Sequence, residues 1–173
     1  RLTRISVTNV AGQWRGLGEL SLLFTAQILL LNIGTEHTTS SRSIVLISCY
    51  PFFTALFAHL LIPGDRLTLR QVAGMLLAFA GIVTLFAGSL SLTDTAWLLG
   101  DALVLGSGVL LGLRQVVLKR LVADAHPYKV LFWQALMSLP VFVLASWAVE
   151  GGMQSYVWSW RVLAGVLYQG IVV

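Results

Sequence analysis

Charged side chains are scarce in this sequence. Its 173 residues include 11 Lys and Arg and 7 Asp and Glu, which together make up 10% of the chain. An ordinary soluble domain carries roughly 25% charged residues, and so few charges could not cover the surface of a globule of this size. The hydrophobic content of 57% and the mean hydropathy of +0.86 therefore exclude disorder and a soluble two-layer enzyme. They indicate an integral membrane protein.

Cysteine is almost absent as well. The single Cys49 excludes an internal disulfide framework and any metal site built from several cysteines. The net charge is +4, but the basic residues are dispersed between apolar blocks and form no patch for nucleic acid. No Ser/His/Asp or His-Glu-x-x-His arrangement is present. We therefore predict no enzyme, no cofactor, no metal and no nucleic-acid partner.

Six apolar blocks approach or reach the length needed to cross a membrane as helices, which is about 20 residues for a hydrocarbon core of ~30 Å. Their continuous apolar runs, such as residues 28–31, do not alternate as membrane strands do. The predicted fold is an all-α polytopic membrane protein, a helical bundle. The predicted helices are residues 17–34, 44–62, 72–88, 96–118, 130–149 and 160–173.

Charge predicts the orientation of these helices. With the first residues in the cytoplasm, the opposite side holds only two basic residues, Arg42 and Arg161. The positive-inside rule favours this orientation over its inverse. The basic residues on the cytoplasmic side are Arg1, Arg4, Arg15, Arg66, Arg70, Arg114, Lys119, Arg120 and Lys129.

Small residues recur on two of the predicted helices. Gly74, Gly81 and Gly88 follow an alanine every seven residues in the third block, and Gly108 and Gly112 are four apart in the fourth. Seven residues are close to two helical turns, so each set lines one face, and small residues let membrane helices approach closely. We expect these glycines to mark tight helix contacts.

Polar residues inside the apolar blocks are candidates for a substrate cavity. Ser48, Pro51 and His59 share one helical face; Pro51 would bend the helix, and His59 is either a proton relay or a buried hydrogen-bonding residue. Arg114 is either an anchor at the membrane surface or a cavity residue, and Asp101 either caps the start of its helix or lines the cavity. The cavity candidates are Gln27, Ser48, Tyr50, Pro51, His59, Ser107, Arg114, Trp133, Gln134 and Tyr168.

Three segments resemble the EamA family of the drug/metabolite transporter superfamily. They are residues 39–43 (Thr-Ser-Ser-Arg-Ser), 50–56 (Tyr-Pro-Phe-Phe-Thr-Ala-Leu) and 64–68 (Gly-Asp-Arg-Leu-Thr), followed by Gly74 and Gly81. Asp65 stands where the family usually has Glu. Residues 100–134 look like the opening helices of a second EamA repeat. At 111–114 this chain has Leu-Gly-Leu-Arg where many members have Trp-Ala-Leu-Tyr, so Arg114 could favour an anionic solute.

The resemblance implies ten helices in two inverted five-helix repeats. On that basis we expect the sequence to be the middle of a longer protein, with residues 1–92 ending the first repeat and 93–173 opening the second. It further implies a multi-pass exporter of small metabolites or amino acids in the bacterial inner membrane. Expected partners are the lipid bilayer and a small solute, with proton coupling and a homodimer as further expectations. The alternative is a membrane scaffold or subunit that transports nothing.

Overall fold

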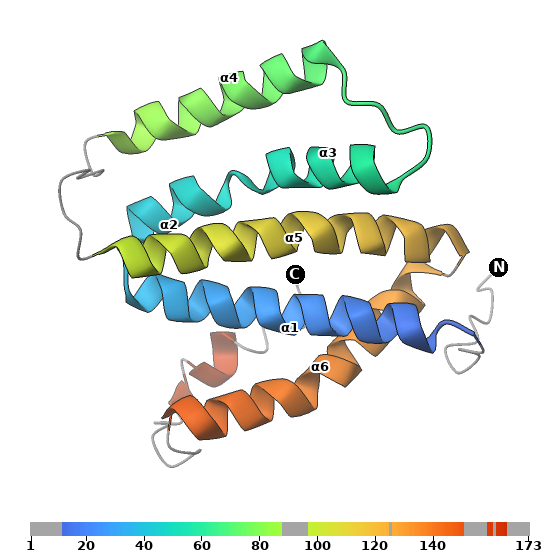
Figure 1. The fold of residues 1–173 in the computed structure, drawn as a ribbon. Coiled ribbons are helices and arrows are strands. Elements are labelled where there is room, and N and C mark those ends of the chain that lie inside the picture. The colour runs from blue at the N-terminus through green and yellow to red at the C-terminus, as the bar shows by residue number, and fades with distance from the viewer. Residues whose placement is uncertain (1–11, 88–96, 125, 151–158, 161, 166–173) are drawn as a thin grey trace. The chain divides into compact units, whose positions relative to one another are not determined.

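The computed structural model describes residues 12–87, 97–124, 126–150, 159–160 and 162–165 of the chain. The chain divides into two compact units, Arg1–Ser138 and Leu139–Val173. The helices are α1 (Trp14–Glu36), α2 (Ser40–Ile47), α3 (Tyr50–Leu61), α4 (Leu69–Phe86), α5 (Leu98–Asp124) and α6 (Pro127–Glu150) (Figure 1).

The described helices carry apolar side chains on their outer faces. Leu22 is 69% exposed, Leu60 66% and Leu77 77%, which in water would be a large unfavourable surface and in a bilayer is the lipid contact. By length and composition, four stretches can cross a membrane: Trp14–Glu36, Ser40–Leu61, Leu98–Ala123 and Pro127–Trp147. The chain is an all-α polytopic membrane protein. The third predicted block corresponds to α4, whose apolar stretch within the described residues, Leu69–Thr84, is too short to count among these four candidate spans.

Local sequence sets where the helices begin and end. Thr39 caps α2 by accepting a hydrogen bond from the Arg42 backbone nitrogen, and Thr68 forms a capping box with Gln71 at the start of α4. Helix α3 ends before the Pro63–Gly64 turn, where Gly64 has a φ of 87° that favours glycine. Because caps lie outside the apolar blocks, the observed helices extend beyond most of the predicted bounds.

The second predicted helix, 44–62, is two helices rather than one. The helical pattern is interrupted at Ser48 and Cys49, between α2 and α3. Pro51 occupies the second position of α3 and has no N–H to donate to the carbonyl four residues earlier, which explains the interruption. The expected bend near Pro51 is thus a two-residue turn, Ser48 and Cys49, between α2 and α3, and both helices belong to one candidate span, Ser40–Leu61.

In the first unit, α5 lies between α1 and the α2–α3 pair (Figure 1). Glycines allow the close approach. A Cβ added at Gly100 would lie 2.4 Å from the backbone carbonyl of His37, at the end of α1. One added at Gly112 would lie 2.7 Å from Phe53 Cβ and 2.8 Å from the backbone nitrogen of Thr54, both in α3. Both sites exclude any larger residue.

The other small-residue positions differ from this pattern. Gly108 lies at ordinary contact distance, its hypothetical Cβ being 3.8 Å from Ile47. Around Gly74 and Gly81 no atom of the described chain lies within 4 Å of such a Cβ, so the tight contact expected for them is not made by the described helices. Gly88 is outside the described residues, as is the repeat boundary expected at 92 and 93.

A small apolar cluster joins the start of α6 to α1. Leu17, Leu20 and Val130 are almost fully buried, and Trp133 packs against them. The Trp133 ring meets that of Trp14 edge to face, with centroids 5.0 Å apart. In the second unit, α6 continues through Pro140 to Glu150, and residues 162–165 are helical. Most of the sixth predicted helix, including Tyr168, is outside the described residues.

Candidate functional site

Three of the predicted cavity residues meet between α1 and α5. The Gln27 side chain is 3% exposed and donates a long hydrogen bond, 3.5 Å, from Nε2 to Oγ of Ser107, which is fully buried. Its Oε1 accepts a hydrogen bond of 3.3 Å from Nη1 of Arg114. Gln27 thus bridges two side chains of α5 with the two ends of one amide. We call Gln27, Ser107 and Arg114 the polar cluster.

Helical spacing brings these residues together. Ser107 and Arg114 are seven residues apart on α5 and so project from the same face. The Arg114 side chain is long, and side chains on a helix generally lean toward its N-terminal end. It therefore reaches the same amide as Ser107. Arg114 lies about 14 Å along the helix from the end of the span at Ala123.

The guanidinium of Arg114 is held with few partners. Its Cζ lies 4.5 Å from the centroid of the Phe24 ring, a cation–π contact one turn before Gln27. Its Nε is buried and has no hydrogen-bond partner in the described part of the chain. The ion pairs among the described residues are Arg42–Asp101 and Lys119–Asp65, and neither involves Arg114. An arginine within a membrane span without a carboxylate partner is costly and usually serves a function.

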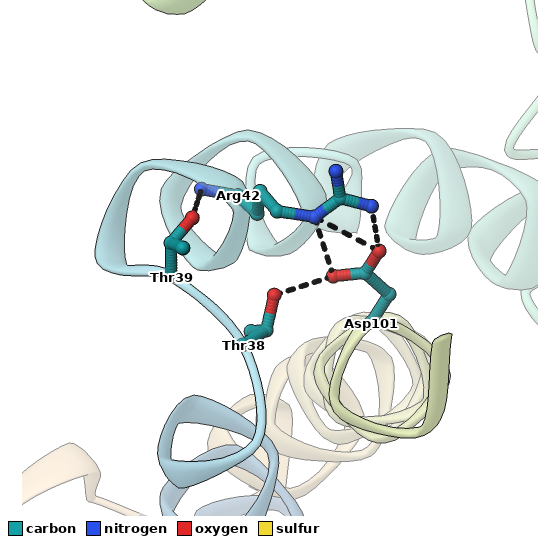
Figure 2. Close-up of polar contacts among 4 residues, drawn as sticks. All are labelled: Thr38, Thr39, Arg42 and Asp101. Atoms are coloured by element: carbon teal, nitrogen blue, oxygen red, sulfur yellow. Dashed lines mark hydrogen bonds and ion pairs between the residues drawn. The ribbon is translucent and has the colours of Figure 1, made fainter. Parts of the chain in front are cut away.

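A second polar group lies at the ends of α1, α2 and α5 (Figure 2). The Arg42 Nε is 3.1 Å from both carboxylate oxygens of Asp101, and its Nη2 also donates to Oδ2. Thr38 Oγ1 donates to Oδ1 at 2.7 Å. Asp101 lies in the first turn of α5, where a negative charge is favourable, but its side chain joins three segments. This ion pair was not predicted, because nothing in the sequence indicates which acid faces Arg42.

The candidates on α2 and α3 make only local hydrogen bonds. Ser48 Oγ donates to the Ile44 carbonyl, and His59 Nδ1 lies 3.2 Å from the backbone oxygen of Asp65. A hollow of about 260 Å³ beside His59 is formed by the turn after α3 and contains no member of the polar cluster. Tyr50 is 36% exposed. Among the described residues, no hydrogen bond joins Ser48, Tyr50, Pro51 or His59 to the polar cluster.

On α6, Gln134 is 4% exposed and its Oε1 has no hydrogen-bond partner among the described residues. Ser138, one turn later, donates to the backbone oxygen of Gln134 rather than to its side chain. Trp133 belongs to the aromatic contact with Trp14 described above. The place of Gln134 and Trp133 in a substrate cavity therefore stays a prediction.

The comparison with protein families identifies the first half of the chain. Residues 3–87 match the EamA-like transporter family. These residues belong to that family. No curated protein and no solved structure matches the chain. The resemblance noted for residues 100–134 lies outside the matched segment.

The EamA-like segment contains α1 to α4, and therefore Gln27 and Arg42. Their partners Ser107, Arg114 and Asp101 are on α5, which follows the matched residues. Both polar groups thus join the EamA-like segment to the helix after it. The four candidate spans make the chain a multi-pass membrane protein, and the family match of residues 3–87 points to a membrane transporter.

Proposed function

We propose that the chain is part of a secondary transporter that exports small metabolites or amino acids across the bacterial inner membrane by alternating access. The observation that supports this most is the polar cluster of Gln27, Ser107 and Arg114. It lies within two candidate spans, where polar and charged side chains are costly and typically mark a substrate path. We therefore place the substrate site at this cluster.

The same cluster suggests how access alternates. In the proposed division into repeats 1–92 and 93–173, Gln27 belongs to the first repeat and both of its partners to the second. Transporters with inverted repeats bind substrate near the midplane, between repeats that rock against each other. A displacement of α5 relative to α1 would change the contact between Gln27 and its two partners and admit solute to the site.

Ion pairs at the two ends of α5 would restrict this movement. Arg42–Asp101 lies near its first turn and Lys119–Asp65 near its last turns. Each connects a residue of the proposed first repeat with α5. In alternating access one end opens while the other stays closed, so we expect the two pairs to be broken in turn. Proton coupling and a homodimer stay predictions.

Counterflow tests the proposal. The complete protein that carries this chain is reconstituted in liposomes loaded with an unlabelled panel of amino acids and small organic acids, and uptake of each labelled compound is measured. We expect counterflow of at least one compound that empty liposomes do not show. Absence of counterflow for every compound, with monodisperse folded protein, would favour the scaffold or subunit alternative.

A further inference from the structure

We propose that the solute carries a single carboxylate group and that Arg114 binds this group through the Nε edge of its guanidinium. The inference rests on the proposed function, because it names the chemical class of what the polar cluster transports. The family assignment does not specify this class, and the argument depends on the hydrogen bonds and charges around Arg114 alone.

The first step concerns the geometry of the guanidinium. It is planar and presents its N–H groups as two edges, and a carboxylate can accept two parallel hydrogen bonds from either edge. Here Nη1 is occupied by Gln27 Oε1 at 3.3 Å. Nε is buried and has no hydrogen-bond partner among the described residues. The edge formed by Nε and Nη2 is thus the one whose N–H groups Gln27 does not engage, and a bidentate ligand would bind this edge when the site opens.

The second step concerns what fixes this edge in place. Gln27 holds Nη1 from one side, and its own amide is held by Ser107. The Phe24 ring lies against the guanidinium with its centroid 4.5 Å from Cζ. A ring face stabilises a cation without consuming its N–H groups. Arg114 is therefore oriented while its hydrogen-bonding capacity stays largely unused, which is the state expected of a preorganised binding group.

The third step concerns charge, which selects a carboxylate over a phosphate. Arg114 is the only cation of the polar cluster, and the other basic residues with described ion pairs, Arg42 and Lys119, are engaged by Asp101 and Asp65. A monoanion would neutralise Arg114 inside the span. A phosphate dianion would leave an excess negative charge there, which the low dielectric of the site disfavours.

The test compares acids with their amides. The complete protein is purified and its thermal unfolding is followed with a panel of small monocarboxylates, each paired with its uncharged primary amide, and with methyl phosphate. Counterflow of the same compounds is measured in liposomes. We expect at least one acid to raise the unfolding temperature and to be transported, while its amide and methyl phosphate do neither.

Two variants assign the effect to Arg114. Arg114→Lys keeps the charge but loses the planar fork, and Arg114→Gln loses both. We expect Arg114→Lys to raise the apparent Kd or KM for the acid by about 10- to 100-fold, the range of a charge-assisted hydrogen bond. Arg114→Gln should weaken binding at least as much. Arg120→Gln is the matched control, because Arg120 is exposed on the same helix and its loss removes the same charge; it should leave the constants unchanged.

The outcomes separate this inference from the proposed function. Transport of amides and acids with equal KM, or an unchanged KM in Arg114→Gln, would overturn the carboxylate assignment while leaving the transporter intact. Binding of an acid that requires Arg114, with no counterflow, would retain the site and overturn the transporter. Neither binding nor counterflow in folded protein would overturn both.

Discussion

Arg42 and Asp101 form an ion pair that links α2 to the first turn of α5, with side chains only 11% and 14% exposed. Figure 2 shows the carboxylate facing the guanidinium on one side and the Thr38 hydroxyl on the other. Arg42 is within the EamA-like segment and Asp101 is beyond it. The pair therefore fastens α5 to the preceding helices at one end, much as the glycine contact of Gly100 with His37 does by packing.

Removing the charge of Asp101 should destabilise the protein. Asp101→Asn removes the carboxylate that pairs with the largely buried Arg42, and losing one partner of such a charge-assisted hydrogen bond costs about 1–3 kcal/mol. We expect the unfolding free energy in a mild denaturant series to fall by that amount. The double variant Arg42→Gln with Asp101→Asn should recover part of the loss, since both charges of the pair are then removed together. The single variant Arg42→Gln completes the comparison. A loss in the double variant equal to the sum of the losses in Arg42→Gln and Asp101→Asn would contradict a direct interaction.

The pair at the other end of α5 should contribute much less. The side chains of Lys119 and Asp65 are 62% and 33% exposed, with Nζ and Oδ2 2.7 Å apart. Exposed ion pairs are typically worth about 0.2–1 kcal/mol and weaken with salt. We expect Lys119→Gln to change the unfolding temperature only slightly, and the change to vanish at high ionic strength. A loss as large as that of Asp101→Asn would show that this end is more deeply enclosed than the structure indicates.

Gly112 should not tolerate even one additional methyl group. In Gly112→Ala the new Cβ would meet Phe53 and the Thr54 backbone at less than 3 Å, so α3 and α5 must move apart, a type of change that costs about 1–3 kcal/mol. Gly18→Ala is the control within a helix, because nothing lies within 4 Å of its added Cβ. The unfolding temperature should fall for the first and not for the second. Equal behaviour would contradict the close approach of α3 and α5.

Restoring an N–H at position 51 should join α2 and α3. In Pro51→Ala the backbone nitrogen can donate to the carbonyl of Ile47, which removes the reason for the break at Ser48 and Cys49. Spin labels at Ser40 and Leu60, which are both exposed, should then separate to about 30 Å, the length of twenty helical residues. An unchanged distance would mean that packing against α5, rather than the proline, produces the break.

The sequence predicted the helices well because their signals are local. Apolar length, the cap at Thr39 and the Pro63–Gly64 turn each depend on a few neighbouring residues, and the structure differs mainly at helix ends and at the break before Pro51. The EamA resemblance was likewise carried by short segments, and the family match of residues 3–87 confirms it.

Pairing between distant residues could not be predicted in the same way. Gln27 and Arg114 are 87 residues apart in sequence, and Arg42 and Asp101 are 59 apart. Polar residues in apolar blocks indicated Gln27, Ser107 and Arg114 as candidates but not that they would meet. The glycine pattern was equally regular on α4 and α5, yet only on α5 does the structure bring it against another helix. Such outcomes depend on which helix faces are opposed.

The solvent accessibility of Ser107 tests the central claim most directly. With Cys49 replaced by alanine, Ser107→Cys is treated with a water-soluble maleimide in the complete protein in membranes. Leu20→Cys, in the apolar cluster, is the buried control, and Arg120→Cys, at an exposed position, is the accessible one. The account predicts that Ser107→Cys reacts faster than Leu20→Cys, because alternating access admits water to the polar cluster, and that a transported acid slows the reaction. Labelling no faster than at Leu20→Cys would contradict it and indicate a closed helical bundle.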